Sequence, residues 1–177
     1  RNYPCDSLLV SGVRRPELEQ KFADWAMLVN MSEFSAAVKA VGILYDKAAS
    51  CERKDTSSNV FETMTGLVIK YLYDPNSPFR NEDVYGHFAE KLSQSDLVNE
   101  ELKPAYAYEV QMCSLNRTGT KAADFRFSDR YGKIRSLYSV DAEYVLLFFS
   151  NPGCEACMDI IEKLKSNGLI SQMISSG

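Results

Sequence analysis

The chain has 177 residues, with 20 lysines and arginines against 24 aspartates and glutamates, a net charge of −4. Apolar residues make up 45% of it, which is enough for a hydrophobic core in one large domain or two small ones. No dense run of basic residues occurs, so we expect no nucleic acid and no anionic membrane surface as a partner. The longest apolar run, residues 144–149, is too short to cross a bilayer, and we expect no transmembrane segment.

The first two thirds of the chain have the apolar spacing of helices. A helix that starts near Pro16 carries one apolar stripe at positions i, i+4, i+7 and i+11, formed by Leu18, Phe22, Trp25 and Val29. The same spacing predicts helices at about 33–49, 59–73, 82–94 and 104–115. The turn-forming sequence of residues 74–78 (DPNSP) ends the third of these five. Alternation with a period of two is almost absent, so residues 1–118 are expected to form an all-α domain of about five helices.

Two of these helices define the expected core most clearly. Ser32 is predicted to cap the second helix. The inward positions of that helix are expected to be Phe34, Val38, Val41 and Tyr45. Those of the fourth helix are expected to be Val84, Tyr85, Phe88 and Leu92.

After Gly119 the pattern changes, and residues 119–177 are expected to form a second, α/β unit, which makes the whole fold α+β. Residues 124–128 alternate as a half-buried strand does, residues 129–132 form a turn, and residues 133–137 return as a second strand. The apolar run 144–150 predicts a strand buried on both faces. Residues 151–153 (NPG) break it, and a helix is expected over about 154–165, with Ile160, Ile161 and Leu164 available for burial.

Five cysteines occur, at positions 5, 51, 113, 154 and 157. Only Cys154 and Cys157 are close in sequence, and the odd number argues against a scaffold held by disulfides. We interpret the other three as spectators: Cys113 as a buried apolar residue, Cys51 as exposed in a polar linker, and Cys5 as a terminal thiol. The single histidine, His87, cannot supply the imidazoles of a catalytic triad or of most zinc sites, and a solvated or capping role is expected for it.

The cysteine pair is predicted to stand between an apolar strand with its turn and the start of a helix. Thiol–disulfide exchange needs a thiolate to attack and a second thiol to resolve the mixed disulfide. One helical turn brings the two sulfurs within reach, and the unpaired N–H groups at the helix start favour the thiolate. The pattern favours a redox-active dithiol. Two alternatives remain open, a structural disulfide and a zinc site, although a second CxxC or a histidine pair for zinc is lacking.

The second part of the chain resembles the front half of the TlpA-like branch of the thioredoxin superfamily. The resemblance rests on the stretch 124–164, with a D-x-x-G-x-x-x-x-L pattern at Asp129, Gly132 and Leu137, followed by the apolar run and the CxxC. It implies a thioredoxin-like hairpin–strand–helix unit and thiol–disulfide oxidoreductase activity outside the cytoplasm. Cys154 would be the attacking thiolate and Cys157 the resolving thiol. No cofactor and no metal are implied, and the partners would be other dithiol or disulfide proteins.

Residues 71–82 (YLYDPNSPFRNE) look like the uncharacterised helical domain that precedes such thioredoxin-like domains in secreted Bacteroidetes proteins. That domain has no known activity to transfer. An alternative function follows from it, in which the helical part is a binding or spacer module of an envelope protein and the thioredoxin-like part is inactive. The chain begins at Arg1 without a methionine, and we expect that a signal segment has been removed.

The chain departs from the TlpA-like pattern in two ways. It has Gly-Cys-Glu-Ala-Cys where a typical member has Trp-Cys-Gly-Pro-Cys, and the carboxylate of Glu155 should disfavour the neighbouring thiolate, so we expect a more reducing pair. No proline follows Pro152, so the cis-proline loop of the family has no counterpart, and we expect the chain to be part of a longer protein. The strand 144–150 would then be an apolar edge open to self-association, and residues 170–177 a frayed end.

Overall fold

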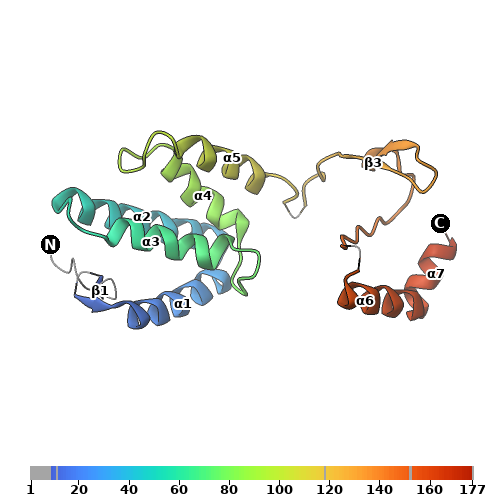
Figure 1. The fold of residues 1–177 in the computed structure, drawn as a ribbon, viewed down its shortest axis with the longest axis horizontal. Coiled ribbons are helices and arrows are strands. Elements are labelled where there is room, and N and C mark those ends of the chain that lie inside the picture. The colour runs from blue at the N-terminus through green and yellow to red at the C-terminus, as the bar shows by residue number, and fades with distance from the viewer. Residues whose placement is uncertain (1–8, 11, 118, 152, 177) are drawn as a thin grey trace. The chain divides into compact units, whose positions relative to one another are not determined.

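The computed structural model of the protein describes residues 9–10, 12–117, 119–151 and 153–176. The chain divides into two compact units, Arg1–Ala122 and Ala123–Gly177. The first contains most of the helices, and the second contains a small hairpin and two helices (Figure 1). The chain is therefore mixed, largely helical, with little sheet.

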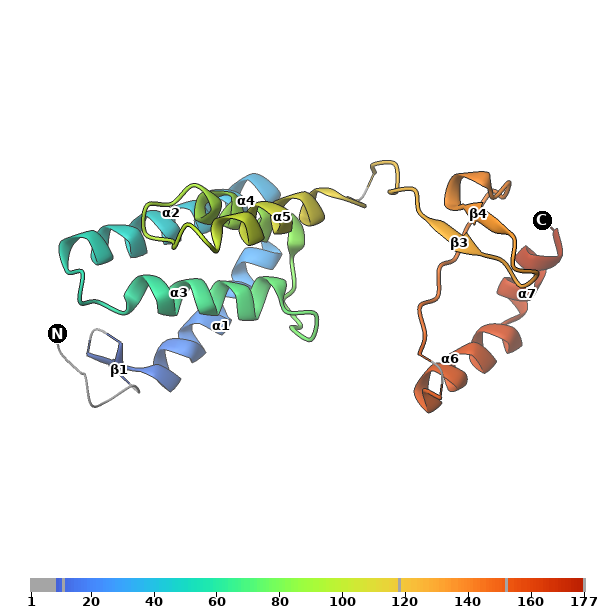
Figure 2. The same ribbon diagram turned by 45° about the horizontal axis from the view of Figure 1, so that its top comes forward.

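The helices of the first unit are α1 (Arg15–Met31), α2 (Phe34–Lys54), α3 (Val60–Val68), α4 (Glu82–Ser93) and α5 (Lys103–Ser114). A π-helical turn, η1 (Ile69–Tyr73), continues α3 before the chain turns back into α4 (Figure 2). Helix α2 runs to Lys54 rather than to residue 49, so the predicted polar linker around Cys51 is wrong. The extra turn is held from outside the helix, since the Arg53 guanidinium donates to the carboxylate of Asp96 at 2.6 Å.

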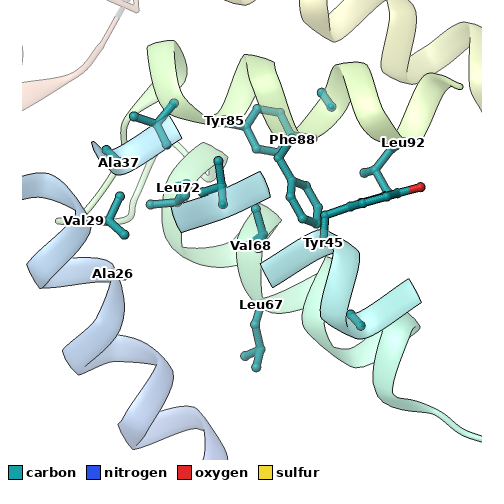
Figure 3. Packing of buried hydrophobic residues seen from close by; sticks show 14 of the residues in the cluster. Ala26, Val29, Ala37, Tyr45, Leu67, Val68, Leu72, Tyr85, Phe88 and Leu92 are labelled. Atoms are coloured by element: carbon teal, nitrogen blue, oxygen red, sulfur yellow. The ribbon is translucent and has the colours of Figure 1, made fainter. Parts of the chain in front are cut away.

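The core of the first unit lies between α1, α2, α3, η1 and α4, with Cys113 of α5 joining it. The four residues predicted as the inner face of α4 are all at most 1% exposed. Figure 3 shows the side chains of Tyr85, Phe88 and Leu92 on α4 gathered with Tyr45 of α2, and the rings of Tyr45 and Phe88 meet edge to face at 5.9 Å. Burial of this stripe is what positions α4, and α5 packs along α4 as well.

Two predictions at the start of α2 are wrong. Phe34 is 52% exposed, because it stands in the first turn of α2, where its ring meets that of His87 at 5.8 Å instead of entering the core. Ser32 does not cap α2. Its hydroxyl donates to the carbonyl oxygen of Leu28 at 2.7 Å and so belongs to the end of α1.

An asparagine pair fixes the turn between η1 and α4. The side chain of Asn81 caps α4 by accepting from the N–H of Val84 at 3.1 Å, and its amide nitrogen donates to Asn30 Oδ1 on α1 at 2.8 Å. Asn30 in turn donates to the carbonyl oxygen of Phe79 at 2.7 Å. The ring of Phe79 stacks on Tyr71 of η1 at 6.1 Å. The residues 71–82 that stood out in the sequence therefore connect α1, η1 and α4.

The first unit was expected to be all-α, but it also contains two short strands. A short antiparallel pair, β1 (Leu9–Val10) and β2 (Val13–Arg14), precedes α1. Two residues per strand give no visible alternation in the sequence, and the sign that was available is Gly12, whose φ of +85° suits a tight hairpin turn.

The second unit contains the predicted hairpin, formed by β3 (Arg126–Ser128) and β4 (Ile134–Ser136) in antiparallel register, with Phe127 opposite Arg135. The carboxylate of Asp129 holds its turn, since Oδ1 accepts from the N–H groups of Tyr131 at 2.9 Å and Lys133 at 3.0 Å. A 3₁₀ turn, η2 (Leu137–Ser139), follows, and then an extended stretch leads to α6 (Glu155–Ser166) and α7 (Gly168–Ser176).

Residues 144–150 do not form the predicted strand. They have no regular secondary structure, and Tyr144, Leu146 and Phe149 are 70%, 69% and 82% exposed. An apolar run becomes a buried strand only when other strands pair beside it, whereas the strands described in this unit, β3 and β4, pair with each other.

Two expectations about the end of the chain also fail. The segment expected to be frayed belongs to α7, whose first turn is capped by Asn167 Oδ1 at 3.1 Å from the N–H of Leu169. Helix α6 has its predicted place, but its apolar positions are not buried: Ile160 is 46% exposed and the other two are half-buried.

Candidate functional site: the cysteine pair at the start of α6

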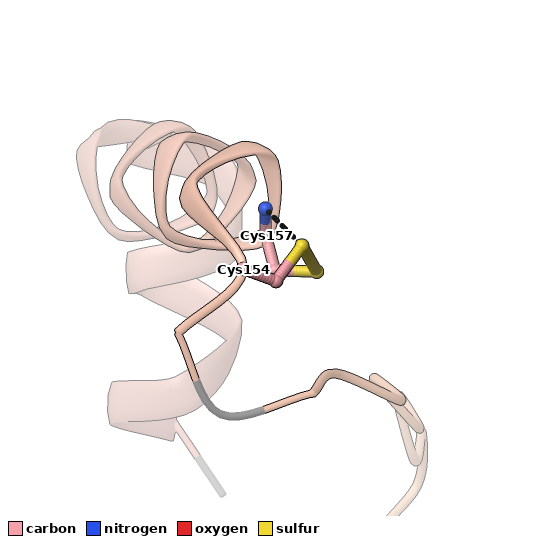
Figure 4. The surroundings of a disulfide bond; sticks show 2 residues. All are labelled: Cys154 and Cys157. Atoms are coloured by element: carbon pink, nitrogen blue, oxygen red, sulfur yellow. Dashed lines mark hydrogen bonds between the residues drawn. A yellow bond between two sulfur atoms is a disulfide. The ribbon is translucent and has the colours of Figure 1, made fainter.

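Cys154 and Cys157 form a disulfide with their Cα atoms 5.2 Å apart (Figure 4). Cys154 is the N-cap of α6, and its Sγ accepts a hydrogen bond from the N–H of Cys157 at 3.3 Å. The carbonyl oxygen of Cys154 accepts from Met158 at 3.1 Å, the first bond of the helix. The structure thus brings both predicted site residues together at a helix start.

The turn before the pair explains this placement. The N–H of Cys154 donates to the carbonyl oxygen of Asn151 at 3.3 Å, and Gly153 has a φ of +79°. A positive φ is a conformation that glycine adopts without steric cost, which fits the glycine at this position. The turn directs the chain into α6 and leaves Cys154 with the extended backbone that an N-cap residue needs.

The two cysteines are partly open to solvent. Both cysteines are half-buried, so a partner sulfur can approach them. Unpaired N–H groups in the first turn of α6 and the helix dipole favour negative charge at Cys154 after reduction. The exposed Glu155 in that turn opposes this effect through repulsion between like charges. A pair with this geometry can exchange two electrons with another dithiol or disulfide.

The remaining described cysteines lie in the first unit. Cys113 on α5 is 2% exposed, as predicted, and burial raises the pKa of its thiol to about 11. Cys51 is exposed, as predicted, although on α2 rather than in a linker. Cys5 lies outside the described residues.

Other residues singled out in the sequence have packing roles. The Tyr73 ring stacks on that of Tyr85 at 4.3 Å, and Tyr71 packs against Phe22 at 5.5 Å, so both tyrosines pack against the core. Burial is the main reason that the pKa values of Tyr71 and Tyr73 are raised. His87 is half-buried beside Phe34.

Within the part of the chain that the structure describes, no three His, Cys, Asp or Glu side chains are grouped so that they could hold a metal ion. The helices among the described residues are all too short or too polar to cross a bilayer.

Residues 6–116 match the model of a protein family described as a domain of unknown function, DUF5106. The chain belongs to the DUF5106 family. The match ends at the close of α5, before the cysteine pair, so membership in DUF5106 by itself assigns no chemistry to Cys154 and Cys157. No curated protein matches the chain.

A solved structure extends the comparison beyond the DUF5106 region. The chain is similar to a thioredoxin-like protein from Bacteroides caccae ATCC 43185, whose crystal structure was determined at 1.90 Å resolution. The two are 34% identical with a TM-score of 0.76, and the similarity covers 98% of this chain. The chain spans 61% of the length of that protein. The likeness therefore includes the cysteine-bearing unit and supports a thioredoxin-like protein.

Sequence reasoning located the pair and its helix but missed the part that Gly153 has in the site. The signal was present in the Pro152–Gly153 dipeptide, which was interpreted only as a strand breaker. The residue order proline then glycine before a capping residue predicts a type II turn with a positive φ at the glycine.

Proposed function

We propose that this DUF5106 protein carries out thiol–disulfide exchange through Cys154 and Cys157, as a TlpA-like oxidoreductase. The observation that carries the proposal is a half-buried disulfide whose first sulfur caps a helix. Support comes from the 34% identity to a thioredoxin-like protein over 98% of the chain.

The exchange has two steps that balance. In the reduced protein, the thiolate of Cys154 attacks one sulfur of a substrate disulfide, forms a mixed disulfide and releases the other substrate sulfur as a thiolate. Cys157 then loses its proton to solvent and attacks Cys154 Sγ, which forms the intramolecular disulfide and releases the second substrate thiolate. Two electrons pass to the substrate. A second dithiol, small or protein-borne, returns them to the cysteine pair.

The test is reduction of insulin disulfides with dithiothreitol as the electron source. The chain is assayed, together with the full product of its gene where that product is longer. Cys154→Ser should abolish the protein-dependent rate, and Cys157→Ser should trap a mixed disulfide. Cys51→Ser is the matched control and should leave the rate unchanged. A rate that is the same with and without Cys154 would rule out the proposal.

Several parts of the proposal concern the protein around the site. We place the protein outside the cytoplasm, in the periplasm or cell envelope, where disulfides persist. We treat residues 1–118 as a helical bundle domain of about five helices and residues 119–177 as the front of a thioredoxin-like domain. The exposed apolar residues 144–149 form a surface through which two copies could associate.

A second candidate function is that the DUF5106 region is a binding or spacer module. It is favoured by the separate core of the first unit and by the end of the family match at residue 116. The test is expression of residues 1–118 alone, with cooperative thermal unfolding as the check that they fold. Specific capture of a partner from an envelope extract by this piece, with equal insulin reduction by the full chain and by residues 119–177, would support it. A loss of rate in residues 119–177 would contradict a pure spacer role.

A further inference from the structure

Gly153, directly before the capping cysteine, has a left-handed backbone with a φ of +79°. Glycine adopts this conformation freely, whereas an L-residue meets a steric penalty there that corresponds to a factor of roughly five to thirty in an equilibrium constant. The penalty does not come from crowding by other parts of the protein, because none of their atoms lies within 4 Å of the position that a Cβ would occupy. The backbone conformation at position 153, and not a lack of space, therefore disfavours any L-residue with a Cβ.

The conformation of Gly153 is connected to the sulfur by two hydrogen bonds. The turn is closed by the bond from Cys154 N–H to Asn151 at 3.3 Å, and the same residue then places its Sγ 3.3 Å from the N–H of Cys157. If the turn opens, the backbone of Cys154 is free to rotate, and the contact between Sγ and that amide is no longer fixed.

We propose that Gly153 is a positioning residue for the cysteine pair: its left-handed backbone holds Cys154 Sγ on the first-turn N–H groups of α6 once the disulfide is reduced. This inference rests on the proposed function, because it concerns the thiolate that would attack.

The reduced form depends on the turn more than the oxidised form does. In the disulfide, the covalent bond to Cys157 keeps Cys154 Sγ at the helix start whatever the turn does. In the dithiol only the turn does so, and the thiolate loses its hydrogen bond when the turn opens. Opening the turn therefore raises the pKa of the Cys154 thiol and makes the pair more reducing.

The test compares the two mirror-image alanines at position 153. Cys113 and Cys154 are natural ligation junctions, so residues 1–112, 113–153 and 154–177 can be joined with either L-Ala or D-Ala at 153, in a background with Cys5→Ser and Cys51→Ser. The readouts are the pH profile of iodoacetamide alkylation of Cys154 in the reduced protein, followed by peptide mass, and the reduction potential against glutathione.

The L-Ala protein should be alkylated at pH 7 more slowly than the glycine protein, by roughly five- to thirtyfold, with a higher thiol pKa and a more negative potential. The D-Ala protein should match the glycine protein, because a D-residue adopts a positive φ without the penalty. Gly168→Ala is the control in the same unit: this glycine has no positive φ and open space around its Cβ position, and no change is expected.

Equal alkylation profiles for the L-Ala and D-Ala proteins would overturn the inference. Circular dichroism of both proteins serves as the check that their helices have formed. The readouts do not require turnover. If the L-Ala and D-Ala proteins differ in alkylation but the glycine protein does not reduce insulin, the positioning role is supported and the proposed function is refuted. If the glycine protein reduces insulin but the L-Ala and D-Ala proteins have the same alkylation profile, the proposed function is supported and the positioning role is refuted.

Discussion

Tyr85 on α4 donates its phenolic hydrogen to a carboxylate oxygen of Glu109 on α5, with 2.5 Å between the two oxygens. The tyrosine is fully buried, and its pKa is raised, first by that burial and then by the neighbouring carboxylate. The hydrogen bond joins α4, whose inner stripe is buried in the core, to α5, the last helix of the DUF5106 region. The two helices also pack closely at Gly86, where an added Cβ would lie 3.1 Å from the Cβ of Cys113.

Tyr85→Phe should therefore lower the free energy of unfolding by about 1–3 kcal/mol, because it leaves the Glu109 carboxylate facing a ring edge without its donor. Urea unfolding followed by circular dichroism measures this. Tyr108→Phe on the same helix as Glu109 is the control. Tyr108 is 60% exposed, and its change should stay within about 0.5 kcal/mol. Equal effects of the two variants would show that the Tyr85 hydroxyl contributes nothing to stability.

Two glycines in helices should respond to alanine in opposite directions. Gly66 on α3 is exposed, and nothing lies within 4 Å of its Cβ position, so Gly66→Ala should stabilise the fold by about 0.5–1 kcal/mol through helix propensity. A Cβ on Gly86 would lie 3.1 Å from the Cβ of Cys113, and Gly86→Ala should force α4 and α5 apart at a net cost of about 1 kcal/mol. Thermal unfolding of both variants checks this, and stabilisation by Gly86→Ala would contradict the tight contact.

The sequence was most informative where one stripe of residues decided both the helix and its burial. On α4 the predicted inner residues Val84, Tyr85, Phe88 and Leu92 are the buried ones, because the helix has neighbours along its whole length. Phe34 follows the same spacing on α2, yet it is exposed, since spacing gives the direction of a side chain and not whether another element lies opposite.

The second unit shows the same limit more strongly. The hairpin could be predicted because alternation and the turn at Asp129 are local signals. The prediction of a strand at 144–150 was wrong, because an apolar run forms a strand only together with the strands that pair with it. At the site, the CxxC spacing located Cys154 and Cys157, but the handedness of Gly153 is a backbone property that composition alone did not reveal.

The thiols of the first unit should differ sharply in reactivity. The thiolate is the reactive form, and burial raises the pKa of Cys113 to about 11, so its thiol stays protonated and shielded at pH 8. Cys51 is exposed. In a Cys5→Ser background, Ellman's reagent at pH 8 should label one thiol of the oxidised native protein, Cys51, and a second only after unfolding.

The sign of this pH effect follows from the raised pKa. The neutral thiol of Cys113 fits the core below its unfolded pKa of about 8.5, and stability is lost as the pH rises towards 11. Cys113→Ala should remove the second, unfolding-dependent label and leave the first. Labelling of Cys113 in the native protein as fast as that of Cys51 would contradict the burial of α5 on α4.

The exposed apolar residues 144–149 give the last prediction. Leu146 and Phe149 are 69% and 82% exposed, and none of the described core residues lies in this run. If this surface mediates the self-association we propose, the double change Leu146→Lys and Phe149→Lys should shift the chain toward the monomer in sedimentation velocity at micromolar concentration. The unfolding free energy should change by no more than about 0.5 kcal/mol, as is usual at exposed positions.

Met31→Lys is the matched control, since Met31 on α1 is also strongly exposed, at 77%, but lies in the first unit. It should leave the sedimentation profile as it is in the unmodified chain. A monomeric unmodified chain would refute self-association through residues 144–149. A dimer that survives the double change but not Met31→Lys would place the contact on the DUF5106 region instead, because only there would an added charge then oppose the burial of apolar surface.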